Sequence, residues 1–438
     1  MQHKMTVDPD KSILVIGAGT FGLSAALEIL RRGHKNLTIL DPYPVPSPLS
    51  AGNDVNKIFQ TAVTHSEFHT MLSFESYKKW KSDDVYKPAF HETGVLYGAT
   101  KPETHKEIEE DYQWLNEKGF EELHLLERPE DYLKLLNVQN DADLKRFQSW
   151  KGFYQKTHSG WMFASLALQR AAQECISLGA KIITDTAEEL LLDKSTQKCI
   201  GVHTSSGNDL LAERIIIAAG ASSVKLFDFE GQLLAKCWTL AHIKLTNDEI
   251  QQLKDTPVII DMDRGFMFEA DAFGDLKFCN EFPGYINMEK YMYKTGEKTV
   301  SIPAYKDAIP EEAEEQMRDL LRQVHPHLAD REFNVAKICW CTDTTDRYFL
   351  IDEHPQHEGL IFATGDSGKG FKYMPVVGEY IASVALEGRD ALPDEKREAW
   401  KWRPEQALNR DIYNVQNRYG GSNKVKDIKD IGKWISAK

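Results

Sequence analysis

Residues 12–41 restrict the fold more strongly than any other stretch of this sequence. The largely apolar run 12–16 has the length of a strand, and Gly17-Ala18-Gly19-Thr20-Phe21-Gly22 follows it directly, before apolar residues at helical spacing. Strand, tight turn and helix in this order are typical of a dinucleotide-binding unit. In such a unit Gly17 permits the sharp turn, Gly19 lets the backbone approach a pyrophosphate, and Gly22 allows the helix to pack closely on the strand.

A second strand, 37–40, leads to Asp41, whose carboxylate can accept hydrogen bonds from ribose hydroxyls. A lone glycine pattern of this kind is weak evidence, because it also occurs as a simple turn in ordinary βα units. Here the strand before it, the helix after it and the acid at the end of the second strand all agree. We therefore predict a dinucleotide site, with an acid that disfavours a 2′-phosphate.

The composition limits the classes of protein to which the chain can belong. Its 438 residues, 42% apolar and 27% charged, suit a globular protein with enough core for two or three domains. A formal charge of −14 disfavours nucleic acid as a partner, because phosphate binding needs a basic face. No apolar stretch has the length of a membrane span, and the first residues do not form a secretion signal. The 6 scattered cysteines, without zinc-type spacing, indicate free thiols and no metal site.

Periodicity and turn residues predict alternating helices and strands along the chain. We expect helices over 66–81, 311–324 and 377–386, charged helices with short breaks over 102–136, and a helix that opens at Gly160-Trp161 and runs to 176. We expect strands over 93–98, 179–184, 199–204, 209–211, 214–221, 238–245, 258–260, 265–269 and 276–279. The strands between 238 and 279 are short and predict an antiparallel sheet. The strand 214–221 ends in small residues, which can bring the backbone close to a cofactor.

The polar segment 50–57 follows the proline-rich stretch 42–48 and is expected to be a loop that enters a helix. Loops in this place commonly cover a cofactor, although a simple connector explains the segment equally well.

Three stretches carry reactive side chains that need an explanation. Lys277 lies on a predicted strand four residues before Glu281, and an amine in that position either points to water at a sheet edge or is buried for a purpose. The residue pattern alone favours the edge. Cys339 and Cys341 share one face of a strand, as small buried residues, as a redox pair or as a covalent link to a cofactor.

The third stretch, 365–372, is rich in glycine and serine. Its backbone N–H groups can form an anion-binding nest to which Lys369 and Lys372 add positive charge. The alternative is an ordinary turn with solvated lysines.

Several motifs together resemble one family. They are Gly17–Gly22, the segments 40–47 and 50–57, Glu281-Phe282-Pro283-Gly284-Tyr285, Ile338-Cys339-Trp340-Cys341-Thr342-Asp343-Thr344, 368–373 and Arg418-Tyr419-Gly420-Gly421. The whole chain resembles the flavin-dependent amine oxidases of the sarcosine oxidase type, and most closely the fungal fructosyl amino acid oxidases, or amadoriases. The proline-rich and Cys-Trp-Cys-Thr stretches are the specific part of this resemblance.

The resemblance implies an α/β (α+β) fold, in which an FAD-binding Rossmann-like domain carries an inserted antiparallel-sheet substrate domain. We assign 10–95, 150–225 and 335–438 to the FAD-binding domain, and 96–149 and 226–334 to the substrate-binding domain. A monomer is the family default.

The resemblance also assigns site residues. FAD is expected to contact Gly17, Gly19, Thr20, Phe21, Gly22, Asp41, Ser50, Asn56, Lys57, Asp366, Gly370, Phe371 and Lys372, and to be joined covalently to Cys339, with Cys341 as the alternative. Lys277 matches the lysine near flavin N5 that assists O₂ reduction, which reverses the edge interpretation. Glu281 matches the carboxylate that faces the substrate amine, Lys372 and Arg418 match cations that hold the substrate carboxylate, and Trp238 is similar to an aromatic residue that covers the pocket.

The implied reaction is the oxidation of the secondary amine of a fructosyl amino acid by O₂, giving glucosone, the free amino acid and H₂O₂. Two features depart from the family. Asn280 stands where an aspartate is usual, and the chain ends Ser436-Ala437-Lys438, one residue short of a peroxisomal signal, so a cytoplasmic or peroxisomal location is expected. The alternatives are an oxidase of sarcosine, pipecolate or saccharopine, a nicotinamide-linked dehydrogenase, and a non-catalytic binding protein with the same fold.

Overall fold

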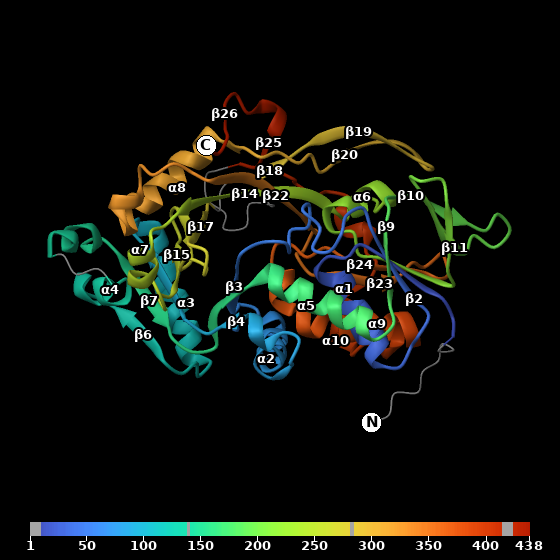
Figure 1. The fold of residues 1–438 in the computed structure, drawn as a ribbon, viewed down its shortest axis with the longest axis horizontal. Helices are drawn as coiled ribbons and strands as arrows, with labels where there is room; N and C mark the ends of the chain where they lie inside the picture. Colours follow the sequence, from blue (N-terminus) through green and yellow to red (C-terminus); the bar gives the residue numbers. More distant parts are fainter. Residues whose placement is uncertain (1–9, 138–140, 281–283, 414–423) are drawn as a thin grey trace.

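Two large sheets dominate the computed structural model, which describes residues 10–137, 141–280, 284–413 and 424–438 (Figure 1). The first sheet has six strands in the order β23-β24-β13-β1-β2-β9. All neighbouring pairs are parallel except β23 with β24. Its strands are β1 (Ile13–Ile16), β2 (Leu37–Asp41), β9 (Lys181–Thr184), β13 (Arg214–Ile217), β23 (Leu350–Glu353) and β24 (Leu360–Thr364).

Helices cover one face of this parallel sheet. α1 (Thr20–Arg31) packs between α5 (Ala164–Ser177) and α9 (Met374–Glu387), so apolar side chains are buried around most of its circumference. These helices lie together just right of the centre in the lower half of Figure 1, with α10 (Asp394–Trp400). The opposite face packs against a small sheet of β10 (Ala187–Leu192), β11 (Cys199–Thr204) and β12 (Asp209–Leu211). Coverage of both faces explains why the strands are continuous apolar runs.

The second large sheet has ten strands and is mostly antiparallel. Its order is β25-β18-β14-β17-β16-β15-β5-β7-β6, and β22 pairs with β14 beside this path. The strands are β5 (Val95–Ala99), β6 (Leu123–Leu126), β7 (Lys151–Gln155), β14 (Leu234–Lys244), β15 (Val258–Asp261), β16 (Gly265–Met267), β17 (Asp275–Cys279), β18 (Tyr285–Ile286), β22 (Val335–Asp343) and β25 (Lys426–Asp427). Within it, β15 runs parallel to β5 and β18 to β25.

The remaining elements surround these two sheets. Three small sheets are formed by β3 (Lys57–Gln60), β8 (Ser159–Met162) and β4 (Phe90–His91), by β19 (Met288–Tyr293) and β20 (Gly296–Ser301), and by β21 (Ile309–Pro310) and β26 (Trp434–Ile435). The other helices are α2 (Glu67–Ser82), α3 (Pro102–Glu117), α4 (Pro129–Leu135), α6 (Ser223–Leu226), α7 (Asn247–Gln252) and α8 (Glu311–Val324). α3, α4, α7 and α8 gather beside the large sheet on the left of Figure 1. Among the helices of the described ranges, none combines the length and hydropathy that crossing a membrane requires.

Most predicted elements are confirmed, and three differ. The loop 50–57 leads into strand β3 and not into a helix. Gly160 and Trp161 lie in strand β8, and α5 begins only at Ala164. The segment 102–136 contains strand β6 between its two helices. All three strands are only four residues long, and a run that short does not show whether its period is that of a helix or of a strand.

The proposed domain boundaries remain a prediction. Strands β7 and β22 fall in segments that we assigned to the FAD-binding domain, and both pair within the ten-stranded sheet. The register of β22 on β14 runs from Val335 opposite His242 to Asp343 opposite Leu234. This pairing brings the Cys-Trp-Cys stretch next to the strand that carries Trp238.

Candidate active site

A cavity of about 970 Å³ lies between the two large sheets and is lined by residues of both. The parallel sheet contributes Ile16, Asp41 and Thr364, which end β1, β2 and β24. Ligands of open α/β sheets bind at this carboxyl edge. The ten-stranded sheet contributes residues of β14, β15, β16, β17 and β22 to the other end. We call these two regions the nucleotide end and the sheet end of the cavity.

The glycine turn at the nucleotide end has the geometry that the sequence predicts. Gly17 has a φ of +108°, and a Cβ there would lie 2.4 Å from the carbonyl oxygen of Ala218. A Cβ on Gly22 would lie 1.8 Å from the carbonyl oxygen of Gly17, so close helix–strand packing requires glycine. Gly19 is the N-cap of α1, no side chain caps it, and the first turn holds no acid. The free N–H groups of that turn fit the pyrophosphate of a dinucleotide.

Asp41 is buried at the same end and organises the turn. One of its oxygens accepts a hydrogen bond from the Ala18 N–H at 2.8 Å, and the other accepts one from the Tyr43 N–H at 3.0 Å. Burial raises the pKa of Asp41, and these hydrogen bonds limit the rise. A carboxylate has about four acceptor positions, so capacity for ribose hydroxyls remains.

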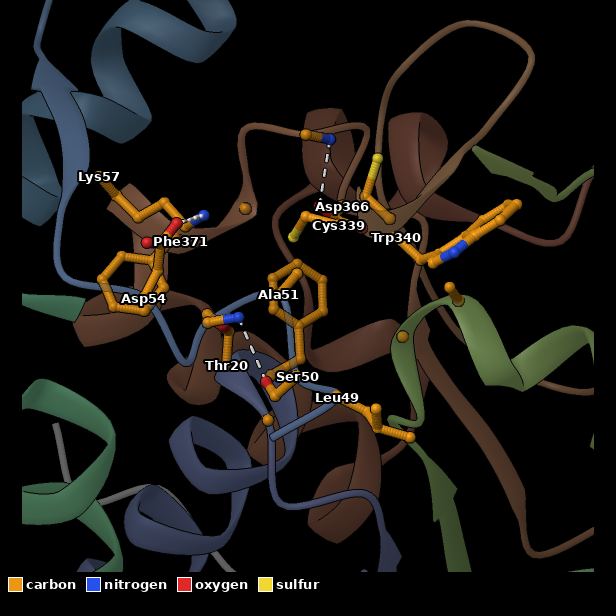
Figure 2. A pocket seen from close by; sticks show the side chains of 18 of the residues that line it. Thr20, Leu49, Ser50, Ala51, Asp54, Lys57, Cys339, Trp340, Asp366 and Phe371 are labelled. Carbon is orange, nitrogen blue, oxygen red and sulfur yellow. Dashed lines mark hydrogen bonds and ion pairs between the residues drawn. The ribbon is translucent and has the colours of Figure 1, made fainter. Parts of the chain in front are cut away.

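Most predicted site residues line this one cavity. Figure 2 shows labelled side chains from distant parts of the chain around one pocket, with Phe371 beside Asp54 and Lys57 and with Asp366 beside Cys339 and Trp340. The predicted residues that line the cavity are Gly17, Gly19, Thr20, Phe21, Asp41, Ser50, Lys57, Trp238, Lys277, Cys339, Asp366, Gly370, Phe371 and Lys372. Gly22 and Asn56 are buried nearby and do not line it, and Glu281 and Arg418 lie outside the described residues. The roles assigned to these residues remain predictions.

Lys277 lies at the sheet end and is buried, so the edge interpretation is wrong. Its strand, β17, has β14 on one side and β16 on the other, so it is a central strand. The side chain of Lys277 is 2% exposed, and its Nζ lies 2.5 Å from Asp54 Oδ2. Nζ also donates a hydrogen bond to the carbonyl oxygen of Asn56 at 2.9 Å. A charged amine is tolerated here because a carboxylate pairs with it.

Lys57 binds the same carboxylate. Its Nζ lies 2.7 Å from Asp54 Oδ2, and Figure 2 shows the pair at the side of the pocket. Burial alone would raise the pKa of Asp54, but the charges of Lys277 and Lys57 outweigh it and hold that pKa well below its usual range. Burial alone would lower the pKa of Lys57. The Asp54 carboxylate outweighs this effect and raises the pKa of that lysine above its usual range.

Both cysteines of the Cys-Trp-Cys stretch line the cavity. Cys339 is partly exposed and lies opposite Trp238 in the β14–β22 register, while Cys341 is buried and lies opposite Lys236. The Sγ of Cys341 is 3.9 Å from Asp343 Oδ1. Cys339 is therefore the more exposed of the two residues, and which cysteine carries the flavin stays a prediction.

The loop 365–372 closes the cavity from the other side. Gly365, Ser367 and Gly368 all have positive φ, and Asp366 holds the turn by accepting hydrogen bonds from the N–H groups of Thr342 and Gly368, each at 3.1 Å. Lys372 is 7% exposed, and its Nζ donates to the carbonyl oxygen of Gln60 at 3.1 Å, so this lysine is not solvated. Burial and the neighbouring charge of Lys369 lower the pKa of Lys372 to about 7.

Some lining residues were not among the predicted site residues. Asp54 belongs to the loop 50–57, which the resemblance places beside the flavin, but it was given no role of its own. Tyr305 and Arg347 come from segments without a motif, and only the tertiary fold brings them to the cavity. In the described part of the chain, no three His, Cys, Asp or Glu side chains form a group that could hold a metal ion.

Comparisons with known proteins agree with this geometry. A family model described as FAD dependent oxidoreductase matches residues 12–384. The solved structure of the deglycating fructosamine oxidase Amadoriase II from Aspergillus fumigatus is 40% identical and superimposes with a TM-score of 0.88, with 99% of each chain covered. L-saccharopine oxidase of Schizosaccharomyces pombe is 30% identical, covering 90% of this chain and 93% of that protein. Monomeric sarcosine oxidase of a Bacillus species is 23% identical, covering 86% and 92%.

Proposed function

This chain belongs to the FAD-dependent oxidoreductase family, as an oxidase of the amadoriase and sarcosine oxidase type that acts on secondary amines, and we propose that its substrates are fructosyl amino acids. The products would be glucosone, the free amino acid and H₂O₂. When bound, FAD supplies the acceptor for the electrons of the amine and passes them to O₂. The glycine turn, the uncapped start of α1 and the cavity between the sheets fit this cofactor.

The observation that carries the proposal is the end-to-end likeness to a fructosamine oxidase. At 40% identity over 99% of both chains, this likeness exceeds the 30% identity to L-saccharopine oxidase. The site supports it chemically. Lys372 offers a buried cation for a substrate carboxylate, and Lys277 places a second cation at the sheet end, where a positive charge favours the reduction of O₂.

Saccharopine is the second candidate substrate, because the relative named for that activity covers 90% of this chain. Saccharopine is also a secondary amine with a carboxylate beside the nitrogen. Both substrates therefore need the same cationic contacts, and they differ in the group on the other side of the nitrogen.

Anaerobic bleaching of the flavin separates these substrates. Purified protein is mixed without O₂ with fructosyl-glycine, fructosyl-lysine, saccharopine, sarcosine or pipecolate, and the visible absorption is followed. We expect rapid bleaching with a fructosyl amino acid, followed by one H₂O₂ per amine when air is admitted. Bleaching with saccharopine alone would move the assignment to the second candidate, and a protein that binds no flavin would contradict the whole proposal.

We further propose that Cys339 carries the flavin through a thioether. Its thiol is the more exposed of the two on β22 and faces the cavity. Acid precipitation of the Cys339→Ser variant should release FAD into the supernatant, whereas wild type and the matched Cys341→Ser control should keep the colour in the pellet. Release from Cys341→Ser and retention by Cys339→Ser would assign the link to the other cysteine.

A further inference from the structure

A single carboxylate oxygen at the sheet end of the cavity serves two lysines. Asp54 Oδ2 is 2.5 Å from Lys277 Nζ and 2.7 Å from Lys57 Nζ. The side chains of Asp54 and Lys277 are 3% and 2% exposed, and that of Lys57 is 25% exposed. Among the described residues, Asp54 is the one carboxylate that pairs with either lysine. Two positive charges therefore share one negative charge, and the carboxylate and one of the two lysines are almost fully buried.

The backbone around Asp54 fixes its position. Its Oδ1 accepts a hydrogen bond from the Val55 N–H at 2.9 Å, and its carbonyl oxygen accepts one from the Ser165 N–H, also at 2.9 Å, at the start of α5. The Lys277 ammonium is held between Asp54 and the Asn56 carbonyl and lies 5.1 Å from the centre of the Phe268 ring. The carboxylate is thus a rigid anchor, and the lysine is placed by it.

The other titratable groups that face this cluster are the His242 imidazole and the thiols of Cys279 and Cys339. His242 lies opposite Lys277 in the β14–β17 register, and burial, together with the Lys277 charge, lowers the pKa of His242 to about 4, so the ring is neutral near pH 7. The thiols of Cys279 and Cys339 act on Lys57 in the same direction as Asp54 and raise the pKa of that lysine, but less strongly than the carboxylate does. The Lys57, Asp54 and Lys277 side chains together therefore carry one net positive charge next to the cavity.

We propose that Asp54 is a positioning residue, which keeps Lys57 and Lys277 charged together and holds the Lys277 ammonium at the sheet end of the cavity. The inference rests on the proposed oxidase function, in which Lys277 assists the reduction of O₂. Without the carboxylate, the buried Lys277 ammonium and the partly exposed Lys57 ammonium would repel each other, and one of them would give up its proton in the ordinary working range of pH. The charge that favours O₂ reduction would then disappear as the pH rises.

The Asp54→Asn variant tests the proposal without turnover. In this variant one lysine would be neutral in the folded state and charged in the unfolded state between about pH 7 and about pH 10. The unfolded state then binds more protons, so the stability of the variant should rise with pH relative to wild type. We expect the Tm of the variant, measured on the protein as purified, to lie below that of wild type by an amount that decreases across this pH range. Asp54→Glu, which keeps the charge, should show a constant difference.

Asp261→Asn is the matched control. Asp261 is also buried and pairs with Arg264 at 2.9 Å, but it does not line the cavity. Burial raises the pKa of Asp261 to about 6, so this group is ionised above pH 7 and its loss should give a constant Tm deficit. A constant deficit for Asp54→Asn as well would overturn the proposal, because the carboxylate would then have only a structural role.

The two half-reactions supply the second readout. In Asp54→Asn, the rate constant for reoxidation by O₂ should fall by about tenfold per pH unit once the pH exceeds the pKa of the lysine that loses its proton. The rate of anaerobic reduction by the amine should follow the wild-type pH profile. Parallel profiles for wild type and variant would contradict the proposal. If no amine reduces the wild type, the proposed function fails, and the Tm titration still decides the role of Asp54.

A variant that does not fold is also informative. If Asp54→Asn does not accumulate as folded protein and Asp261→Asn does, the double variant Asp54→Asn/Lys277→Met removes the uncompensated charge together with its partner. Because the cost of breaking a buried ion pair comes from the charge left behind, we expect the double variant to fold. Failure of the double variant to fold would overturn the proposal.

Discussion

Individual residues at this site are charged or neutral according to what the fold places beside them. Lys277 and Lys372 are both buried lysines that line one cavity, yet their partners differ. Lys277 pairs with the Asp54 carboxylate, whereas Lys372 donates to a carbonyl oxygen and faces the positive charge of Lys369. Residue type and motif predict that lysines stand here, but the difference between them comes from contacts across several hundred residues of sequence.

The Lys372 contacts predict a pH dependence. Because its pKa is lowered to about 7, Lys372 loses its charge as the pH rises through that value, and kcat/KM for a carboxylate substrate should fall on the alkaline side. Lys372→Met should abolish this limb and lower kcat/KM by about 10- to 100-fold. Lys369→Met removes the repelling charge and should shift the limb to higher pH. An unchanged limb in Lys372→Met would assign the titration to another group.

At the scale of elements, the packing of α1 on β1 builds the nucleotide end of the cavity. The sequence predicts this unit almost to the residue, because the strand, the glycines and the helix are contiguous and their contacts are local. The strands β3, β6 and β8 were mispredicted or missed, because each is only four residues long and pairs with a strand that does not adjoin it in sequence: β3 pairs with β8, and β6 pairs with β7 beyond an intervening helix. Pairing with a distant strand overrides the weak local preference of so short a segment.

Gly22 provides the test of this packing. A methyl group there would lie 1.8 Å from the Gly17 carbonyl oxygen, so Gly22→Ala forces the helix away from the strand. We expect a loss of stability of about 3 kcal/mol or more, measured by urea unfolding, and little flavin in the purified protein. The control is Gly432→Ala, which meets no atom within 4 Å and should change stability by less than about 0.5 kcal/mol. Wild-type stability and flavin content in Gly22→Ala would contradict this account.

For the molecule as a whole, the cavity joins the two large sheets, and a ligand that fills it contacts both. The parallel sheet supplies the turn and Asp41, and the ten-stranded sheet supplies Lys277 and Cys339. A cofactor bound there is therefore expected to stabilise the whole protein and not one sheet alone.

Removal of the proposed covalent link makes this coupling measurable. In Cys339→Ser the FAD would be exchangeable, so its removal should lower Tm. FAD added at 100 times its Kd should restore Tm by raising the free energy of unfolding by about 2.7 kcal/mol. Wild type and Cys341→Ser should not respond to added FAD. Limited proteolysis should report protection of both sheets at the same FAD concentration. Protection of the parallel sheet alone would contradict a shared cavity. So would a Tm of Cys339→Ser that does not change when FAD is added.

The geometry of the nucleotide end of the site could be predicted from the sequence, since Gly17, Gly19, Gly22 and Asp41 act through contiguous strands, a turn and a helix whose contacts are local. The sequence also indicated that Cys339, Lys277 and Lys372 are reactive side chains in unusual surroundings. Residue patterns alone left an ordinary structural explanation open for each of them. Only the tertiary structure placed β22 on β14, buried Lys277 in a central strand and gave it the Asp54 oxygen that Lys57 also binds. The physical reason is that burial and charge pairing depend on which distant strands meet, and period and spacing along the chain do not encode that directly.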